Sequence, residues 1–152
     1  MRNGLIYHFL DDDELLRISN KIKEAEKTTA GEICVSIKEH KSFTQKRKTV
    51  RALAEQEFFK QGVDKTRDKT GILIFILLES RQFYILADAG INSKVKQDTW
   101  DAIKAEMEKM FARGQFCSGI MHGIEQVGKI LSAHFPIKPD DTNELSDRVR
   151  ID

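Results

Sequence analysis

Apolar positions along the chain recur with two different periods, which separate helices from strands. Four segments have apolar residues three and four positions apart, as amphipathic helices do: about residues 14–27, 44–61, 96–112 and 116–134. Residues 32–40 instead alternate apolar and polar side chains, which is typical of a strand. Residues 71–78 are apolar almost throughout, which indicates a strand buried on both faces, and residues 82–88 predict a third strand.

The connections between these segments predict the topology. The link between residues 78 and 82 is long enough only for a hairpin, so strands 71–78 and 82–88 should be antiparallel. Strands 32–40 and 71–78 are joined through a helix, so a right-handed crossover should make them parallel. The sequence therefore predicts an α/β fold, a three-layer α/β/α sandwich on a small mixed sheet in the order α-β-α-β-β-α-α. One domain would span residues 1–136, followed by a polar tail over residues 137–152 that should be mobile or weakly docked.

Short local motifs predict where the helices begin and how closely they pack. Asp11 with Glu14, and Ser42 with Gln45, have the spacing of capping boxes at helix starts. The last helix contains glycines, each of which costs roughly 1 kcal/mol relative to Ala inside a helix. Such residues indicate close approach to a neighbouring element; they are Gly119, Gly123 and Gly128.

Composition and charge exclude several classes of protein. Lys and Arg number 25 against 24 Asp and Glu, so the net charge of +1 creates no field toward nucleic acid. The apolar run over residues 72–78 is far shorter than the roughly 18 residues of a membrane span. The N-terminus has no apolar region typical of a signal peptide, so we expect a cytoplasmic protein. Cys34 and Cys117 should be free, reduced thiols without a catalytic role.

Four acidic residues should meet at one edge of the sheet, where the first two strands start and the third ends. They are Glu32, Asp64, Asp68 and Asp88. Carboxylates on turns beside Gly90 suit a hard cation, and we expect Ca²⁺ or Mg²⁺. The alternative is that these acids are solvated or cap helices, as Asp88 could do for the helix that follows it.

Several blocks, taken in order, resemble the TPM domain family. They are Thr29-Ala30-Gly31-Glu32-Ile33, Thr70-Gly71-Ile72-Leu73, Glu79-Ser80-Arg81 and Asp88-Ala89-Gly90-Ile91. The resemblance covers about residues 9–136 and is strongest to the short soluble bacterial branch. It implies an α/β/α sandwich, divalent-cation binding as in some members, and a weak phosphatase activity as in a plant member.

The sequence is compatible with three functions. The first is a divalent-cation-binding interaction domain, linked to membrane-protein maintenance and acting with an unknown protein partner. The second is a metal-assisted phosphatase, in which one of Asp68 and Asp88 holds the ion and the other acts as base. The third is a structural adaptor without ligand, docking through a groove lined by Trp100 and the helix at 116–134.

Overall fold

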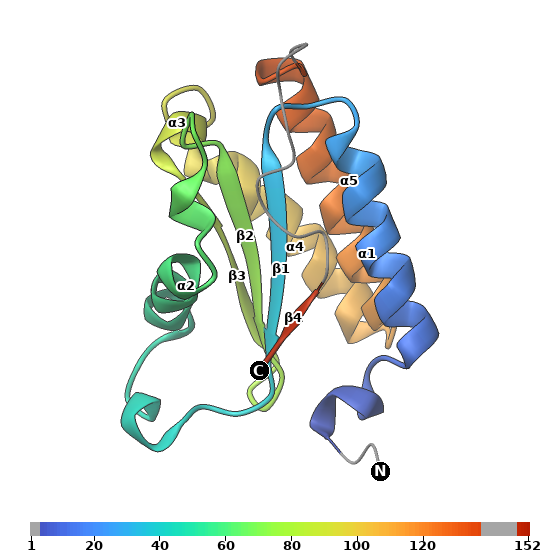
Figure 1. Ribbon diagram of the computed structural model, residues 1–152. Coiled ribbons are helices and arrows are strands. Elements are labelled where there is room, and N and C mark those ends of the chain that lie inside the picture. The colour runs from blue at the N-terminus through green and yellow to red at the C-terminus, as the bar shows by residue number, and fades with distance from the viewer. Residues whose placement is uncertain (1–3, 138–148) are drawn as a thin grey trace.

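A four-stranded mixed sheet forms the centre of the molecule in the computed structural model, which describes residues 4–137 and 149–152 (Figure 1). Its strands lie in the order β3-β2-β1-β4. Their bounds are β1 (Glu32–Lys38), β2 (Gly71–Leu77), β3 (Gln82–Ala87) and β4 (Arg150–Ile151). β1 is parallel to β2, and β2 is antiparallel to β3, as the connections predict. The sheet directions inferred from the sequence are therefore confirmed.

Helices cover both faces of this sheet, so the three-layer α/β/α sandwich is confirmed. In Figure 1, α2 lies against one face, whereas α1, α4 and α5 cover the other. The α-helices are α1 (Asp12–Glu26), α2 (Val50–Lys60), α3 (Ala89–Asn92), α4 (Gln97–Ala112) and α5 (Phe116–His134). Three short 3₁₀ turns complete the described elements: η1 (Leu5–His8), η2 (Phe43–Gln45) and η3 (Val63–Lys65).

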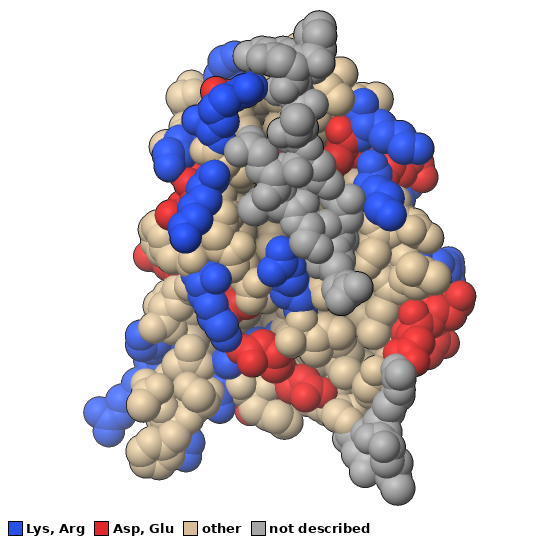
Figure 2. All heavy atoms as spheres, viewed as in Figure 1, with Lys and Arg blue, Asp and Glu red and all other residues tan. Residues whose placement is uncertain are grey.

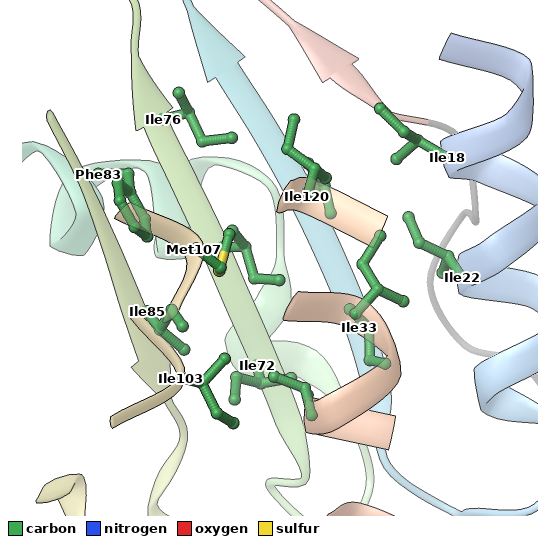
Figure 3. Packing of buried hydrophobic residues seen from close by; sticks show 14 of the residues in the cluster. Ile18, Ile22, Ile33, Ile72, Ile76, Phe83, Ile85, Ile103, Met107 and Ile120 are labelled. Carbon is green, nitrogen blue, oxygen red and sulfur yellow. The ribbon is translucent and has the colours of Figure 1, made fainter. Parts of the chain in front are cut away.

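The strand pattern divides the core into two clusters, one on each face of the sheet. Alternate residues of a strand point to opposite faces, so Ile33 packs in the larger cluster with α1, α4 and α5, while Cys34 packs with α2. In the larger cluster, Ile72 of β2 and Met107 of α4 lie among branched aliphatic side chains (Figure 3). β2 is buried at every position, which explains its uninterrupted apolar sequence.

The helix α5 packs closely on its neighbours at the glycines that the sequence singles out. A Cβ atom at Gly123 would lie 2.5 Å from the Met107 sulfur in α4, and one at Gly128 would lie 2.9 Å from the Ala25 Cβ in α1. Both distances are too short for ordinary contacts between these atoms. The predicted close approach of this helix is therefore confirmed.

Trp100 is fully buried inside the larger cluster. A side chain with 0% exposure cannot line a groove on the surface. The adaptor hypothesis in the form that uses a groove at Trp100 is therefore wrong. The reason is the helical stripe of α4, which directs Trp100, Ile103 and Met107 to the sheet. No helix of the described residues is long and apolar enough to cross a bilayer.

The start of the second helix differs from the prediction. The capping box of Ser42 and Gln45 forms, but it closes only the 3₁₀ turn η2. α2 begins later, where the Thr49 hydroxyl accepts a hydrogen bond from the Ala52 amide at 3.1 Å. Three consecutive cations at residues 46–48 would oppose the positive end of a helix dipole, which favours the later start. The capping box of Asp11 and Glu14 forms at α1 as predicted.

The last residues of the chain form a fourth strand that the sequence pattern did not predict. β4 pairs in parallel with β1, and the Asp152 carboxylate contacts the Lys60 ammonium at 3.0 Å and the Lys38 ammonium at 3.1 Å. These hydrogen bonds from Lys60 and Lys38 lower the pKa of Asp152. The predicted tail spans 137–152, and residues 138–148 of it lie outside the described residues.

A polar network lies inside the smaller cluster, under α2. The Ser36 hydroxyl of β1 donates to the Glu57 carboxylate of α2 at 2.6 Å, and the Gln61 amide donates to the same oxygen at 2.8 Å. Ser36 and Glu57 are both buried. A buried carboxylate is tolerated only when donors replace its lost water, so this network holds α2 on the sheet.

Candidate functional site

Three neighbouring strands bring Glu32, Gly71 and Asp88 into one row at the end of the sheet. Glu32 and Gly71 are register partners at the starts of β1 and β2. The amide of Asp88, directly after β3, donates to the carbonyl of Gly71 at 2.9 Å. The antiparallel return of β3 therefore places Asp88 beside the start of β2, as the sequence predicts.

The turn η3, together with the loop that leads from it to β2, lies over the start of β2 on the face that α2 occupies. A Cβ atom at Gly71 would lie 2.5 Å from the Val63 carbonyl oxygen, so η3 packs directly over the start of β2. Glu32 is on the same face, because side chains alternate along β1 and Cys34, two positions on, packs against α2. Asp64 follows Val63 in η3, so it lies close to this covered row.

The same loop also packs against α3 through its backbone. A Cβ atom at Gly90 would lie 2.3 Å from the Asp68 carbonyl oxygen and 2.5 Å from that of Lys69. Lys69 has a positive φ of 58° and donates from its ammonium to the Asp64 carbonyl at 2.7 Å. Gly90, which the sequence already places beside the predicted site, and Lys69, which no sequence signal identified, are thus positioning residues.

Asp64 and Asp88 each have one buried carboxylate oxygen with no hydrogen-bond partner in the described structure. One Asp88 oxygen caps α3 by accepting from the Ala89 amide at 2.7 Å, and the other, Oδ2, is buried and unpartnered. In Asp64 the buried oxygen is Oδ1. A buried anionic oxygen without a donor costs free energy unless water or a cation satisfies it. Asp88 therefore caps the short helix α3 with one of its two oxygens and does not cap the helix at 97–112, whose N-cap is Lys96.

The other two predicted acids have different surroundings. Asp68 is exposed, and the Arg67 guanidinium contacts its carboxylate at 3.3 Å. Glu32 is 4% exposed, and its amide donates to the Thr70 carbonyl at 3.0 Å. Among residues 4–137 and 149–152, no three side chains of His, Cys, Asp or Glu converge as a set of metal ligands. An ion here would need additional main-chain or water oxygens.

The thiols have the properties of structural residues rather than nucleophiles. Burial raises the pKa of the Cys34 thiol to about 11 and also raises that of Cys117. The nearest candidate base along the chain, His122, contacts Glu106 on α4 at 2.6 Å. These observations agree with the prediction that neither cysteine is a catalytic nucleophile.

Comparison with known proteins agrees with the motifs and the fold. The TPM domain family model matches residues 7–130. The structure of the BA42 protein from the psychrophilic bacterium Bizionia argentinensis is 33% identical with a TM-score of 0.84, covering 95% of this chain and 96% of that one.

Two more distant structures share the fold alone. The N-terminal domain of a P. gingivalis protein is 16% identical with a TM-score of 0.68, covering 84% of this chain and 79% of that one. The N-terminal domain of the cg2496 protein from Corynebacterium glutamicum is 13% identical with a TM-score of 0.61, covering 86% and 82%. No curated protein matches the chain. The family model spans most of the chain, and the chain therefore belongs to the TPM domain family.

Proposed function

We propose that this chain is a divalent-cation-binding interaction domain whose ion site lies at the acidic rim, defined as Glu32, Asp64, Asp68 and Asp88. The observation that supports it is the pair of buried, unpartnered oxygens, Asp64 Oδ1 and Asp88 Oδ2. Water can donate hydrogen bonds to these oxygens, but it cannot neutralise two partly buried negative charges. A divalent cation coordinates the oxygen atoms directly and also neutralises their charge.

The chemistry of the rim favours calcium over magnesium. Calcium takes six to eight oxygen ligands, including main-chain carbonyls and water, with flexible geometry. Among the described residues no three acidic side chains converge, but the loop before β2 brings the carbonyl oxygens of Asp68 and Lys69 against Gly90, two residues after Asp88. Magnesium demands a near-ideal octahedron and keeps more of its own water, which suits such a loop less well.

Calorimetric titration with calcium chloride and magnesium chloride tests this site. Asp88→Asn is the sharpest variant, because Asn also caps helices well and the change removes the charge while keeping the cap. We expect wild type to bind calcium and Asp88→Asn to bind it about tenfold more weakly or worse, as fewer charged ligands lower calcium affinity. Asp64→Asn should behave in the same way.

The matched control is Asp13→Asn, which makes the same chemical change in the first turn of α1. This exposed residue is not part of the rim, so its calcium affinity should equal that of wild type. If wild type gives no heat above buffer dilution, or if Asp88→Asn binds as tightly as wild type, the proposed site is wrong.

In this proposal the ion fixes the loop before β2 against α3, so a partner would recognise the ion-bound shape of this end of the sheet. We keep two expectations from the sequence as part of this proposal, a role linked to membrane-protein maintenance and a cytoplasmic location. Crosslinking in cell lysate, with calcium or with chelator, tests whether binding of a partner depends on the ion. A partner captured equally well under both conditions would separate the interaction from the ion.

The metal-assisted phosphatase remains an alternative at the same rim. The unpartnered oxygen of Asp88 would accept a proton from an attacking water, and a bound ion would lower the pKa of that water. Turnover of a phosphate ester that needs added metal and is lost in Asp88→Asn would support it. Equal turnover in wild type and Asp88→Asn would exclude a role of this residue in hydrolysis.

A further inference from the structure

A pocket lies at the other end of the sheet, beside the hairpin that joins β2 and β3. Its volume is about 280 Å³, and it is lined on the α4 and α5 side by residues from η1, the hairpin and the turn between those helices. The β3 strand separates it from the acidic rim by its six residues, or roughly 20 Å. This pocket is therefore a different site from the one proposed above.

Four phenyl rings form a continuous wall of this pocket. The ring centroids of Phe9 and Phe116 are 5.0 Å apart, those of Phe116 and Phe111 are 4.8 Å apart, and those of Phe111 and Phe83 are 5.2 Å apart. Three of these rings are only partly buried, whereas Phe83 is 3% exposed. Such a wall offers favourable contact to a flat apolar group of similar size.

The formal charge in the described lining of the pocket is basic. Arg81 supplies it, His8 also belongs to the lining, and none of the described lining residues is acidic. The Arg81 guanidinium lies over the Phe9 ring at 6.0 Å and makes no ion pair with any residue that the structure describes. An arginine held beside an apolar wall without a carboxylate partner is suited to an anionic ligand, because its fork can donate two parallel hydrogen bonds.

Two acidic residues follow β1 and β2 at this end of the sheet, and each already accepts a hydrogen bond from a backbone amide. The Glu39 carboxylate accepts from the Ile6 amide at 2.7 Å, and the Glu79 carboxylate accepts from the Lys41 amide at 2.7 Å. The hydrogen bond from the Lys41 amide lowers the pKa of Glu79, because it stabilises the ionised carboxylate in this contact. Neither contact involves Arg81.

The backbone of Arg81 adopts a conformation that favours glycine. Its φ is 55°, in the left-handed region, at the last position of the hairpin turn. A residue with a Cβ atom pays roughly 1 kcal/mol or more there, and Gly or Asn is the usual choice. An arginine at a backbone position that favours glycine, beside a pocket, indicates that its side chain has a role there.

We propose that this pocket binds a small organic anion, with an aromatic or similarly compact apolar body against the phenylalanine wall and a carboxylate paired with Arg81. The volume suits a molecule the size of one or two fused rings, smaller than most drug-like ligands. His8 also belongs to the lining and supplies a second polar side chain there. This activity is separate from cation binding and needs no ion.

The test is an NMR titration of the intact chain with 3-phenylpropionate and with 2-naphthylacetate, each compared with its uncharged amide. The backbone amides over residues 78–83 and 111–116 should shift, while those of the acidic rim should not. Each acid should bind about fivefold more tightly than its amide, which is the effect of one exposed ion pair.

Arg81→Asn isolates the guanidinium, because Asn tolerates the left-handed backbone and leaves the turn intact. The variant should bind acid and amide equally. The control is Arg51→Gln, which removes another arginine stacked on an aromatic ring, Tyr84, at 5.9 Å on the opposite face of the sheet. It should leave the preference for the acid unchanged. If neither acid shifts the pocket amides at millimolar concentration, or if wild type binds acid and amide equally, the proposal is overturned.

Discussion

One added methyl group tests the close packing of the loop before β2 against α3. In the variant Gly90→Ala, the new Cβ atom would lie 2.3 Å from the Asp68 carbonyl oxygen and 2.5 Å from that of Lys69. A carbon and a carbonyl oxygen normally approach to about 3.3 Å. The methyl group therefore overlaps two backbone oxygens by about 1 Å, and neither can rotate away as a side chain would.

Two opposing terms set the expected magnitude. Alanine is favoured over glycine in a helix by at most about 1 kcal/mol, which would stabilise the variant. Overpacking costs about 1 to 3 kcal/mol. The cost here should be at the upper end, because the methyl group meets backbone atoms that cannot rotate away. The net expectation is a loss of about 2 kcal/mol in the free energy of unfolding, or a melting temperature lower by about 4 to 8 °C.

Urea unfolding followed by fluorescence of Trp100 measures this loss, since Trp100 is the single tryptophan and is fully buried. Ala105→Gly, at an exposed position of α4, is the control for helix propensity and should lose about 1 kcal/mol. If Gly90→Ala proves as stable as wild type or more so, the loop does not pack on α3 as described.

Three further variants or conditions test other parts of the structure. Asp152→Asn removes the anion beside Lys60, so exchange of the β4 amides should quicken at neutral pH. The hydrogen bond from Lys60 lowers the pKa of Asp152, so the slower amide exchange of wild type relative to the variant should be fully present above the ordinary carboxyl pKa. It should disappear as the pH falls through the lowered pKa. A difference in exchange that persists unchanged in acid would contradict this. Burial raises the pKa of Cys34 to about 11, so a thiol reagent at mildly alkaline pH should label it far more slowly in native protein than in urea, and equal rates would refute its burial. Ser36→Ala removes the 2.6 Å donor to buried Glu57 and should cost about 1 to 3 kcal/mol in urea unfolding, whereas an unchanged midpoint would show that the network contributes nothing.

The sequence predicts the fold well where local signals and long-range packing agree. The apolar run at residues 72–78 required cover on both faces, and the clusters on both sides of β2 supply it. The balanced charge is also visible on the surface, where basic and acidic side chains both occur across the face in Figure 2. The strand β4 could not be predicted, because two residues show no periodicity and their pairing depends on the edge of β1.

The candidate sites were less accessible from the sequence, for different physical reasons. Asp88 could be placed beside the start of β2 from strand direction alone, but the burial of its second oxygen depends on tertiary packing that no sequence pattern encodes. The contact of Asp68 with Arg67 depends on side-chain rotamers that no pattern encodes. The pocket beside Arg81 was missed because its rings come from separate elements that meet only in the folded chain.

The most direct test of the account is a calcium titration of the uniformly ¹⁵N-labelled protein, followed by NMR. Saturable shifts should be confined to the amides of residues 63–71 and 87–91, and Asp88→Asn should lose them at the same calcium concentrations. Shifts that are absent, that persist unchanged in Asp88→Asn, or that appear only at the hairpin end of the sheet would contradict the assignment of the ion to Asp64 and Asp88.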